Sequence, residues 1–327
     1  MFKGFLGPVL ALALFTGPAL AGSPWKTWVV DEAVPGDLAV GRIWSVGSQS
    51  FVSASAMLAD LRTARFVLAG EVHDNPVHHQ LQGWIVDKLA SGTGLHLVVE
   101  MLSADQAPAL ESFARLPDRT PDSLAETVDW QNSGWPDFDI YAPVFEAALA
   151  GGAVLAHGLP GRAATRAVSR AGFDALDQGL LESLRLSVPL STKADEALKA
   201  EIQSAHCDLL PVAALPNMAA VQRYRDAYLA DALRQTPDTG PAVLIAGNGH
   251  VRRDLGVPLY LQAADGRVLA VLMREVDPEM TRDEAVAALS DSPADYVWLT
   301  PAIERPDPCA ALRERFGKTA PAPVDTD

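Results

Sequence analysis

The chain has 327 residues, of which 49% are hydrophobic, and its 41 acidic and 26 basic side chains give a formal net charge of −15 at pH 7. An acidic chain without an evident basic patch is not expected to bind nucleic acid or an anionic membrane surface. Its two cysteines, Cys207 and Cys309, can form a disulfide in an oxidising compartment or remain as two buried free thiols.

The first 21 residues have the pattern of a secretory signal peptide. Lys3 precedes an apolar stretch at 5–15, and Ala19-Leu-Ala21 offers a cleavage site of small residues. The apolar stretch is too short to span a bilayer, and no later segment is long and apolar enough to do so. No cysteine near the cleavage site could accept a lipid. We therefore expect an exported, periplasmic protein without a membrane span, cleaved after about Ala21.

Beyond the signal peptide, the chain divides into a turn-rich arm at 22–40, a domain at 41–317 and a Pro/Ala-rich tail at 318–327 that we expect to be disordered. Short apolar runs predict strands at 42–46, 66–69, 95–101, 153–157, 242–246, 268–273 and 296–299. Amphipathic patterns predict helices at 55–61, 76–89, 139–150 and 218–233. Strands that alternate with helices predict an α/β fold with a central, mainly parallel sheet flanked by helices. The Pro-interrupted stretch at 162–236 is expected to be a helical insertion in this fold.

Two of the predicted strands end in the same motif, Gly-x-x-His. The first is Gly70-Glu-Val-His73 and the second is Gly247-Asn-Gly-His250. Ligands bind at the carboxyl ends of strands in α/β sheets, so two histidines presented in this way are expected in one cleft. Gly70, Gly247 and Gly249 would let the backbone turn sharply and would allow a ligand to approach closely.

Glu71 and His73 are two residues apart in an extended segment and therefore point to the same side. A carboxylate beside an imidazole can act as a general acid/base pair or as two metal ligands. Glu100 ends the next predicted strand and can reach the same space, and Asn248 and His250 arrive from the second motif. The alternative is purely structural, because a histidine at a strand end often only binds a backbone carbonyl.

For four further residues the pattern leaves the location or the role open. His78 and His79 do not form a helical zinc motif, and we expect them at the surface or at the rim of the cleft. His206, beside a cysteine, is either a ligand or a half-exposed histidine next to a disulfide. Tyr141 either lines a flat apolar cavity or packs in the core. No Walker loop, Gly-x-Ser-x-Gly elbow or Cys-x-x-Cys-His motif is present, so covalent c-type haem attachment is excluded.

Six separated motifs, in order, resemble the ChaN-like haem-binding family, which belongs to the superfamily of the Tiki proteases and erythromycin esterases. The resemblance extends from about Trp44 to Leu312. The motifs are Gly70-Glu-Val-His-Asp-Asn-Pro76, Val98-Val-Glu-Met101, His206-Cys207, Gln222-Arg-Tyr-Arg-Asp226, Gly247-Asn-Gly-His-Val-Arg-Arg-Asp254 and Arg305-Pro-Asp-Pro-Cys309.

The resemblance implies non-covalent haem, a part in haem or iron uptake together with transport components, and a homodimer formed around haem. The iron ligand would be a histidine or a tyrosine. The candidates for cofactor binding are His73, Tyr141, His206, His250 and Arg252. The chain departs from the family in two places: it lacks the lipid-accepting cysteine of many relatives, and it has His157-Gly-Leu-Pro160 where relatives tend to carry Asn before Leu-Pro.

Hydrolytic members of the superfamily use the same histidines and acidic residue in a catalytic centre, with or without a divalent metal. The alternative function is therefore a hydrolase with Glu71, His73, Glu100 and His250 as catalytic residues. In it Glu71 and His73 would activate water, while His250 and Arg252 stabilise the developing charge. We favour haem binding, because the resemblance to the haem-binding branch covers far more of the chain than the shared core. A scaffold with a vestigial site is a third alternative.

Overall fold

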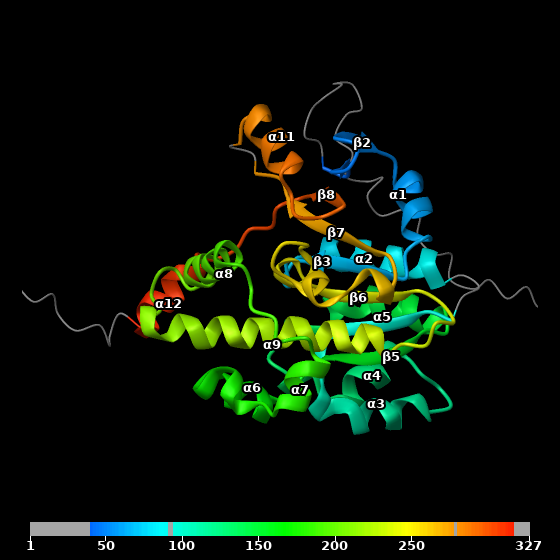
Figure 1. Ribbon diagram of the computed structural model, residues 1–327. Coiled ribbons are helices and arrows are strands. Elements are labelled where there is room, and N and C mark those ends of the chain that lie inside the picture. Colours follow the sequence, from blue (N-terminus) through cyan, green and yellow to red (C-terminus); the bar gives the residue numbers. More distant parts are fainter. Residues whose placement is uncertain (1–39, 91–93, 278–279, 317–327) are drawn as a thin grey trace, which may run out of the picture.

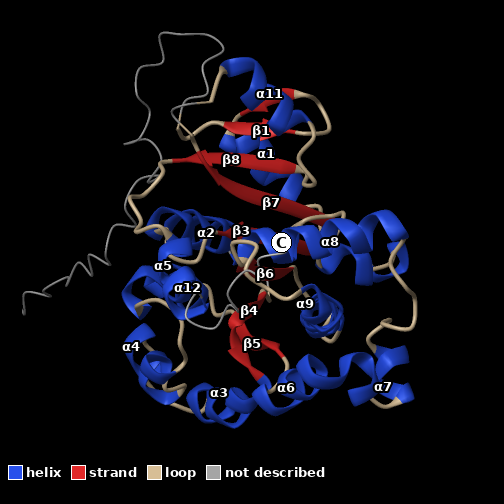
Figure 2. Cartoon of the chain, turned by 90° about the vertical axis from the view of Figure 1, so that its left-hand side faces the viewer, coloured by secondary structure: helices blue, strands red, loops and turns tan. Residues whose placement is uncertain are grey.

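The computed structural model describes residues 40–90, 94–277 and 280–316 (Figure 1). The expected signal peptide at 1–21, nearly all of the arm at 22–40 and the expected disordered tail at 318–327 lie outside the described residues. Within them the chain has the expected α/β fold, in which a central sheet lies between two layers of helices (Figure 2).

The strands form one eight-stranded sheet in the order β2-β1-β8-β7-β3-β6-β4-β5. Neighbouring strands from β8 to β5 run parallel, whereas β1 pairs antiparallel with both β2 and β8. The strands are β1 (Ile43–Ser45), β2 (Ser50–Val52), β3 (Phe66–Glu71), β4 (His96–Ser103), β5 (Val154–Leu159), β6 (Ala242–Gly247), β7 (Val268–Glu275) and β8 (Tyr296–Thr300). The expected mainly parallel sheet is therefore confirmed, and the short edge strand β2 is an addition that the sequence pattern did not indicate.

Alternate residues of the central strands point into two separate cores, because successive side chains of a strand face opposite sides of the sheet. In β3, Val67 and Ala69 pack into the larger core and Phe66 and Leu68 into the other. The larger core is covered by α1 (Ala54–Leu61), α2 (Pro76–Ala90), α3 (Ala107–Ala114), α4 (Pro121–Thr127) and α5 (Phe138–Ala150). The opposite core is covered by α6 (Arg162–Ala171), α7 (Gln178–Ser183), α9 (Leu215–Arg234) and α10 (Asn248–Val251).

The remaining helices lie at the ends of the molecule. The longest of these, α8 (Thr192–Ala205), packs on α9, and α12 (Pro308–Phe316) lies beside α8 (Figure 1). Helix α11 (Arg282–Ser290) covers the β1–β8 end of the sheet. Short 3-10 helices connect the larger elements: Ala104–Gln106, Trp130–Asn132, Gly172–Ala175, Val212–Ala214, Val257–Tyr260 and Ala263–Asp265. Helices α6 to α9 fill the connection between β5 and β6, where the sequence predicts the helical insertion.

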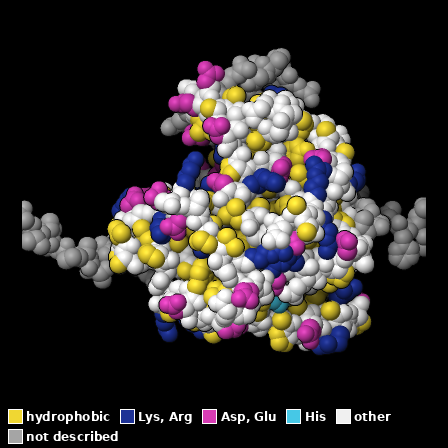
Figure 3. Space-filling view, in the orientation of Figure 1, with side chains coloured by type: hydrophobic (Ala, Val, Ile, Leu, Met, Phe, Trp, Pro, Cys, Tyr) yellow, Lys and Arg dark blue, Asp and Glu magenta, His cyan; other side chains and the backbone are white. Residues whose placement is uncertain are grey.

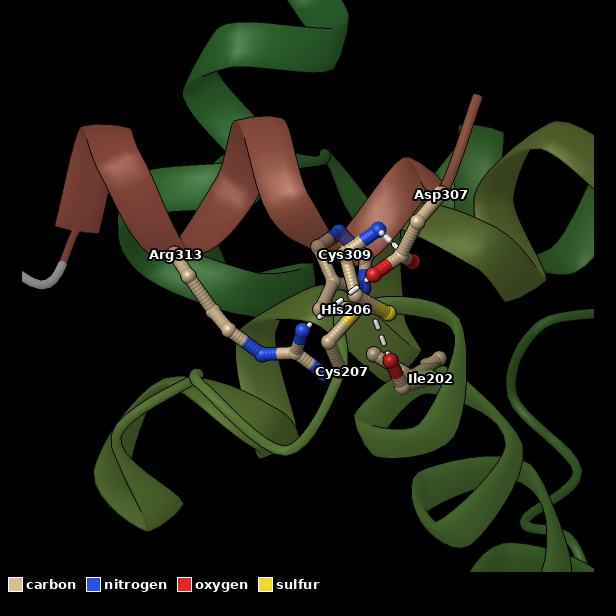
Figure 4. The surroundings of a disulfide bond; sticks show 6 residues. All are labelled: Ile202, His206, Cys207, Asp307, Cys309 and Arg313. Carbon is tan, nitrogen blue, oxygen red and sulfur yellow. Dashed lines mark hydrogen bonds and ion pairs between the residues drawn. A yellow bond between two sulfur atoms is a disulfide. The ribbon is translucent and has the colours of Figure 1, made fainter. Parts of the chain in front are cut away.

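A disulfide between Cys207 and Cys309 fastens α12 to the end of α8 (Figure 4). Of the two alternatives for these cysteines, the disulfide is therefore the correct one. The segment that leads from β8 to α12 is also held at the carboxyl edge of the sheet, because Arg305 forms ion pairs with Asp74 and Glu275. The C-terminal part of the described chain is thus joined both to α8 and to the loop that follows β3.

Acidic and basic side chains alternate over the face seen in Figure 3, and apolar side chains gather at the end formed by α8 and α12. Among the helices of the described ranges, none combines the length and the apolar character needed to cross a bilayer.

Candidate functional site

The two Gly-x-x-His motifs meet at the carboxyl edge of the sheet, as the sequence predicts. Strands β3 and β6 are parallel neighbours in which Glu71 pairs with Gly247, so the chain leaves both strands at the same level. Glu100, in β4, lies between the two histidines that follow. Its Oε1 is 3.2 Å from His250 Nε2 and its Oε2 is 3.9 Å from His73 Nε2.

Glycine is required at the carboxyl ends of β3 and β6, where the two motifs contact each other. A Cβ atom at Gly70 would lie 2.3 Å from Asn248 Oδ1, and one at Gly247 would lie 2.9 Å from His73 Nε2. Both distances are too short for real carbon contacts, so the two motifs can approach only because these side chains are missing. At both positions the space that glycine leaves is filled by a side chain of the other motif, and the expected close approach of a ligand stays a prediction.

Glu71 is a buried anion that orients His73. Its Oε1 accepts a hydrogen bond from His73 Nδ1 at 2.7 Å, and its Oε2 lies 3.2 Å from His79 Nδ1. Burial raises the pKa of Glu71, but the hydrogen bonds from His73 and His79 outweigh burial and bring this pKa to about 2. Tyr141 adds a hydrogen bond from its hydroxyl to the backbone oxygen of His73 at 3.1 Å.

His73 is the accessible member of this group. Its side chain is 36% exposed, its Nδ1 is bound to Glu71, and its ring packs against Trp135 with ring centroids 4.9 Å apart. Burial lowers the pKa of His73, but the hydrogen bond to Glu71 and the charge of Glu100 raise it above its ordinary value. Nε2 lies 3.9 Å from Glu100 Oε2 and close to the backbone at Gly247. Because Glu71 holds Nδ1, Nε2 is the nitrogen that is left to exchange a proton or bind a metal.

His250 is a buried cation held between two carboxylates. Its Nδ1 lies 2.6 Å from Asp226 Oδ1, while its Nε2 faces Glu100. Burial lowers the pKa of His250, but the charges of Glu100 and Asp226 raise it to about 10. For Glu100, burial raises the pKa, and His250 and His73 lower it to about 2. Both ring nitrogens of His250 are therefore engaged inside the protein.

Asp226 is a site residue that the sequence analysis did not single out, although it belongs to one of the motifs of the resemblance. It is fully buried on α9, on a face otherwise made of apolar residues. Burial raises its pKa to about 6, and His250 works in the opposite direction. A lone aspartate on an apolar helix face was the available signal, because buried carboxylates need a partner.

A cleft of about 380 Å3 opens beside Glu100 and Trp135. Its volume lies in the range of small-molecule sites. Apolar side chains and basic side chains share its walls. The lining residues are Glu100, Met101, Ser103, Gln106, Ser133, Gly134, Trp135, Leu159, Pro160, Arg162, Thr165, Arg166 and Arg225. Trp135 and the arginines of this cleft were also not singled out from the sequence.

The expectation that His78 and His79 lie at the surface is wrong, since both are completely buried. His78 accepts a hydrogen bond from Val72 N at 2.8 Å and lies 2.8 Å from Thr300 Oγ1, and burial lowers its pKa to about 4. His79 Nε2 binds the backbone oxygen of His73 at 3.0 Å. The reason is that the first turn of α2 lies under the loop after β3, so both histidines brace this loop.

The other expected site residues are placed in different ways. Tyr141 is completely buried, and burial raises its pKa strongly, so its hydroxyl stays protonated against Glu71. Asn248 turns away from the cleft and binds the backbone of Met273. Arg252 forms ion pairs with Glu201 and Asp254.

His206 lies apart from the cleft, at the end of α8 beside the disulfide (Figure 4). Its Nδ1 binds the backbone oxygen of Ile202 at 2.7 Å. It lines a smaller hollow of about 160 Å3, which Asp226 and Gly249 line from the other side. Within the described ranges, no group of three or more His, Cys, Asp or Glu side chains is arranged to hold a metal ion. We therefore derive no step through a divalent metal.

A comparison with protein families matches residues 57–261 to the family described as haem-binding uptake, Tiki superfamily, ChaN. The chain belongs to this family. The matched segment contains both Gly-x-x-His motifs, Glu100, Asp226 and the arginines of the cleft, so the family assignment covers the whole candidate site. No curated protein matches the chain in sequence.

One solved structure has the same fold, and two others are more weakly similar. A structure of ChaN of Campylobacter jejuni, described as showing cofacial haem binding, has a TM-score of 0.62 and 19% sequence identity, and the alignment covers 78% of this chain and 95% of that one. The type III effector HopBA1 follows with a TM-score of 0.42 and 13% identity over 76% and 92% of the two chains. An erythromycin esterase in its open conformation has a TM-score of 0.38 and 12% identity over 84% and 87%.

Proposed function

We propose that this protein is exported, binds haem non-covalently in the cleft at the carboxyl edge of the sheet, and takes part in haem or iron uptake. The observation that carries the proposal is the family match, which spans the strands and helices that build the cleft. The Campylobacter protein of the same fold, which binds haem, adds support. Haem supplies an iron centre, and the chain supplies a ligand, apolar walls and charge.

The residues around the cleft fit this group. Haem iron takes an imidazole nitrogen, and Glu71 leaves Nε2 of His73 for it by binding Nδ1. Burial lowers the pKa of His73, but Glu71 and Glu100 raise it above its ordinary value, so iron must displace a proton from this nitrogen. Trp135, which packs on this histidine, and Met101, Leu159 and Pro160 give the cleft an apolar wall suited to a porphyrin face. We therefore propose His73 as the iron ligand. Tyr141 and His250 are engaged in buried hydrogen bonds, so in this conformation neither offers a free donor atom.

His206 is the competing candidate for the iron ligand. Its Nδ1 is bound to the backbone oxygen of Ile202, which leaves Nε2 for iron, and its side chain lines the hollow that Asp226 also lines. Absorbance titrations with hemin distinguish the two histidines. We expect His73→Ala to shift the Soret band of the complex and weaken binding, and His206→Ala to leave both unchanged. The reverse result would transfer the iron to the hollow beside the disulfide.

The expected homodimer is part of the proposal and has its own test. Size-exclusion chromatography with light scattering, with and without one equivalent of hemin, measures the mass of the complex. We expect the mass to double when hemin is added. An unchanged monomer mass would remove dimer formation from the proposal and would leave haem binding untouched.

Export is supported by the signal-peptide pattern and by the disulfide, since disulfides persist in oxidising compartments. The mass of the protein recovered from cells that carry the full gene tests this step. We expect loss of the first 21 residues or so and recovery in the periplasmic fraction. A full-length protein in the cytoplasmic fraction would contradict export.

A hydrolase is the second candidate, and one observation favours it: Glu71 and His73 form a buried carboxylate–imidazole pair beside an open cleft. In this function His73 Nε2 takes a proton from water, and Glu71 stabilises the resulting imidazolium. The cation His250 lies on the other side of Glu100, which contacts both histidines. Because Arg252 is bound by two carboxylates, we assign it no part in the reaction. Hydrolysis of a panel of esters and amides that disappears in His73→Ala and Glu71→Gln would establish this function.

A further inference from the structure

Three arginines line the cleft. Arg162 and Arg166 are one turn apart on α6, and Arg225 reaches the same cleft from α9, which packs on α6. Arg166 is exposed and forms no ion pair with any residue in the described ranges. The Nε of Arg225 is buried and has no hydrogen-bond partner within the same ranges.

Such a group is costly unless something binds it, because a buried guanidinium N–H loses its hydration. The acidic side chains nearby are largely engaged by other groups, although the charge of Arg225 also acts on Asp226, where burial raises the pKa and this charge lowers it. Glu100 and Asp226 share the cation His250, and Asp105 accepts a hydrogen bond from the backbone nitrogen of Arg162. The guanidinium of Arg162 donates one hydrogen bond, at 3.1 Å, to the backbone oxygen of Ser133. The guanidinium of Arg166 and the Nε–H of Arg225 are therefore available to a ligand.

We propose that Arg162, Arg166 and Arg225 form a subsite for the carboxylate groups of the ligand that occupies the cleft. Guanidinium groups bind carboxylates through paired hydrogen bonds, which are stronger than neutral ones. Trp135 also lines this cleft, so the cleft suits a ligand with a flat apolar body and acidic groups. The identity of this ligand rests on the proposed function, in which the acidic groups are the haem propionates.

Iron-free protoporphyrin IX and its dimethyl ester test the subsite without the iron ligand. The two differ only in whether the propionates carry charge, and binding is followed by quenching of tryptophan fluorescence. We expect the wild-type protein to bind the diacid about tenfold more tightly than the diester, since one charge-assisted interaction supplies about 1.4 kcal/mol. Arg225→Gln and Arg166→Gln should each weaken binding of the diacid about three- to tenfold and leave the diester unchanged.

Two variants serve as controls. Arg119→Gln removes an exposed arginine outside the cleft and should change nothing. Arg225→Lys keeps the charge and loses the planar fork, so it should fall between Arg225→Gln and the wild type. Circular dichroism melting curves of every variant show that the fold is retained.

The outcomes separate the subsite from haem binding. Equal affinities for diacid and diester, or variants that leave their ratio unchanged, would overturn the subsite even if hemin binds well. A ratio that collapses in the arginine variants while hemin binds no better than protoporphyrin IX would support the subsite and refute iron ligation. Failure of hemin and of both porphyrins to bind would overturn the subsite and the proposed function together.

Discussion

Asp226 Oδ1 lies 2.6 Å from His250 Nδ1, and this contact joins helix α9 to the second Gly-x-x-His motif. The connection between β5 and β6 thus sends one carboxylate from a helix to the carboxyl edge of the sheet. Glu100 contacts the other nitrogen of the same ring. The imidazolium is therefore fixed from both sides, and its removal would leave two buried carboxylates without the cation that they share.

Asp226→Ala should destabilise the protein by about 2 kcal/mol, because the buried Nδ1–H of His250 loses its acceptor while Glu100 still balances the charge. Asp195→Ala is the matched control. Asp195 pairs with Lys199 on the surface of α8 and is 40% exposed, and such pairs are worth less than about 1 kcal/mol. Urea unfolding of the two variants measures both values. Equal losses would show that the contact with His250 carries no special weight.

The stability of the protein should fall steeply in acid. Glu71 and Glu100 have a pKa of about 2 in the folded protein, against an ordinary value of 4.5. A carboxyl group with a lowered pKa stabilises the fold above its unfolded value, and this contribution is lost as the pH falls through the folded value. The melting temperature should therefore decline between about pH 4.5 and about pH 2.

Glu100→Gln isolates one of these two contributions. The variant should start from a lower melting temperature at neutral pH and lose less of it on acidification, because one titrating carboxylate is missing. Melting curves from pH 7 downward compare the two slopes. Curves that run parallel to that of the wild type would contradict the low pKa of Glu100.

Gly247→Ala should displace His73, because the new Cβ would lie 2.9 Å from its Nε2. We expect weaker hemin binding and a shifted Soret band from a protein that still folds, since the histidine ring can move toward solvent. Gly249→Ala is the control within the same motif, because its Cβ would lie 3.7 Å from Glu201 Oε1, an ordinary contact. If the two variants bind hemin equally well, the position of the His73 ring does not control binding.

Loss of the disulfide should destabilise the protein by about 2–4 kcal/mol, because the bond closes a long loop between residues 102 positions apart. Cys207→Ser with Cys309→Ser, compared with the wild type with and without reductant, measures this effect by urea unfolding. Hemin binding should be retained in the double variant, since His73 and the cleft lie apart from the disulfide. A loss of binding would instead favour His206 as the ligand.

Most of the sheet could be predicted from the sequence, because the buried parallel strands are largely continuous apolar runs. The meeting of the two Gly-x-x-His motifs followed from the rule that the carboxyl ends of parallel strands share one edge. β2 could not be predicted, because Ser50-Phe-Val52 is too short and too exposed to show a pattern.

Burial beyond the strands was harder to predict. His78 and His79 were expected at the surface or at the rim of the cleft because they form no helical zinc motif. The loop after β3, Thr300 and Tyr141 bury them, and the last two come from distant parts of the chain. The partnership of Asp226 with His250 depends on how α9 packs on the sheet, which no local pattern encodes. The arginines of the cleft could not be predicted for the same reason, because they come from two helices, α6 and α9, that lie far apart in the sequence.

The central claim is that haem binds in this cleft, and one absorbance titration of the protein from residue 22 onward with hemin tests it most directly. The account predicts a saturable change in the Soret region with a defined stoichiometry, which His73→Ala weakens. A linear increase without saturation, identical in the wild type and in His73→Ala, would contradict haem binding and would leave the Glu71–His73 hydrolase as the function to test.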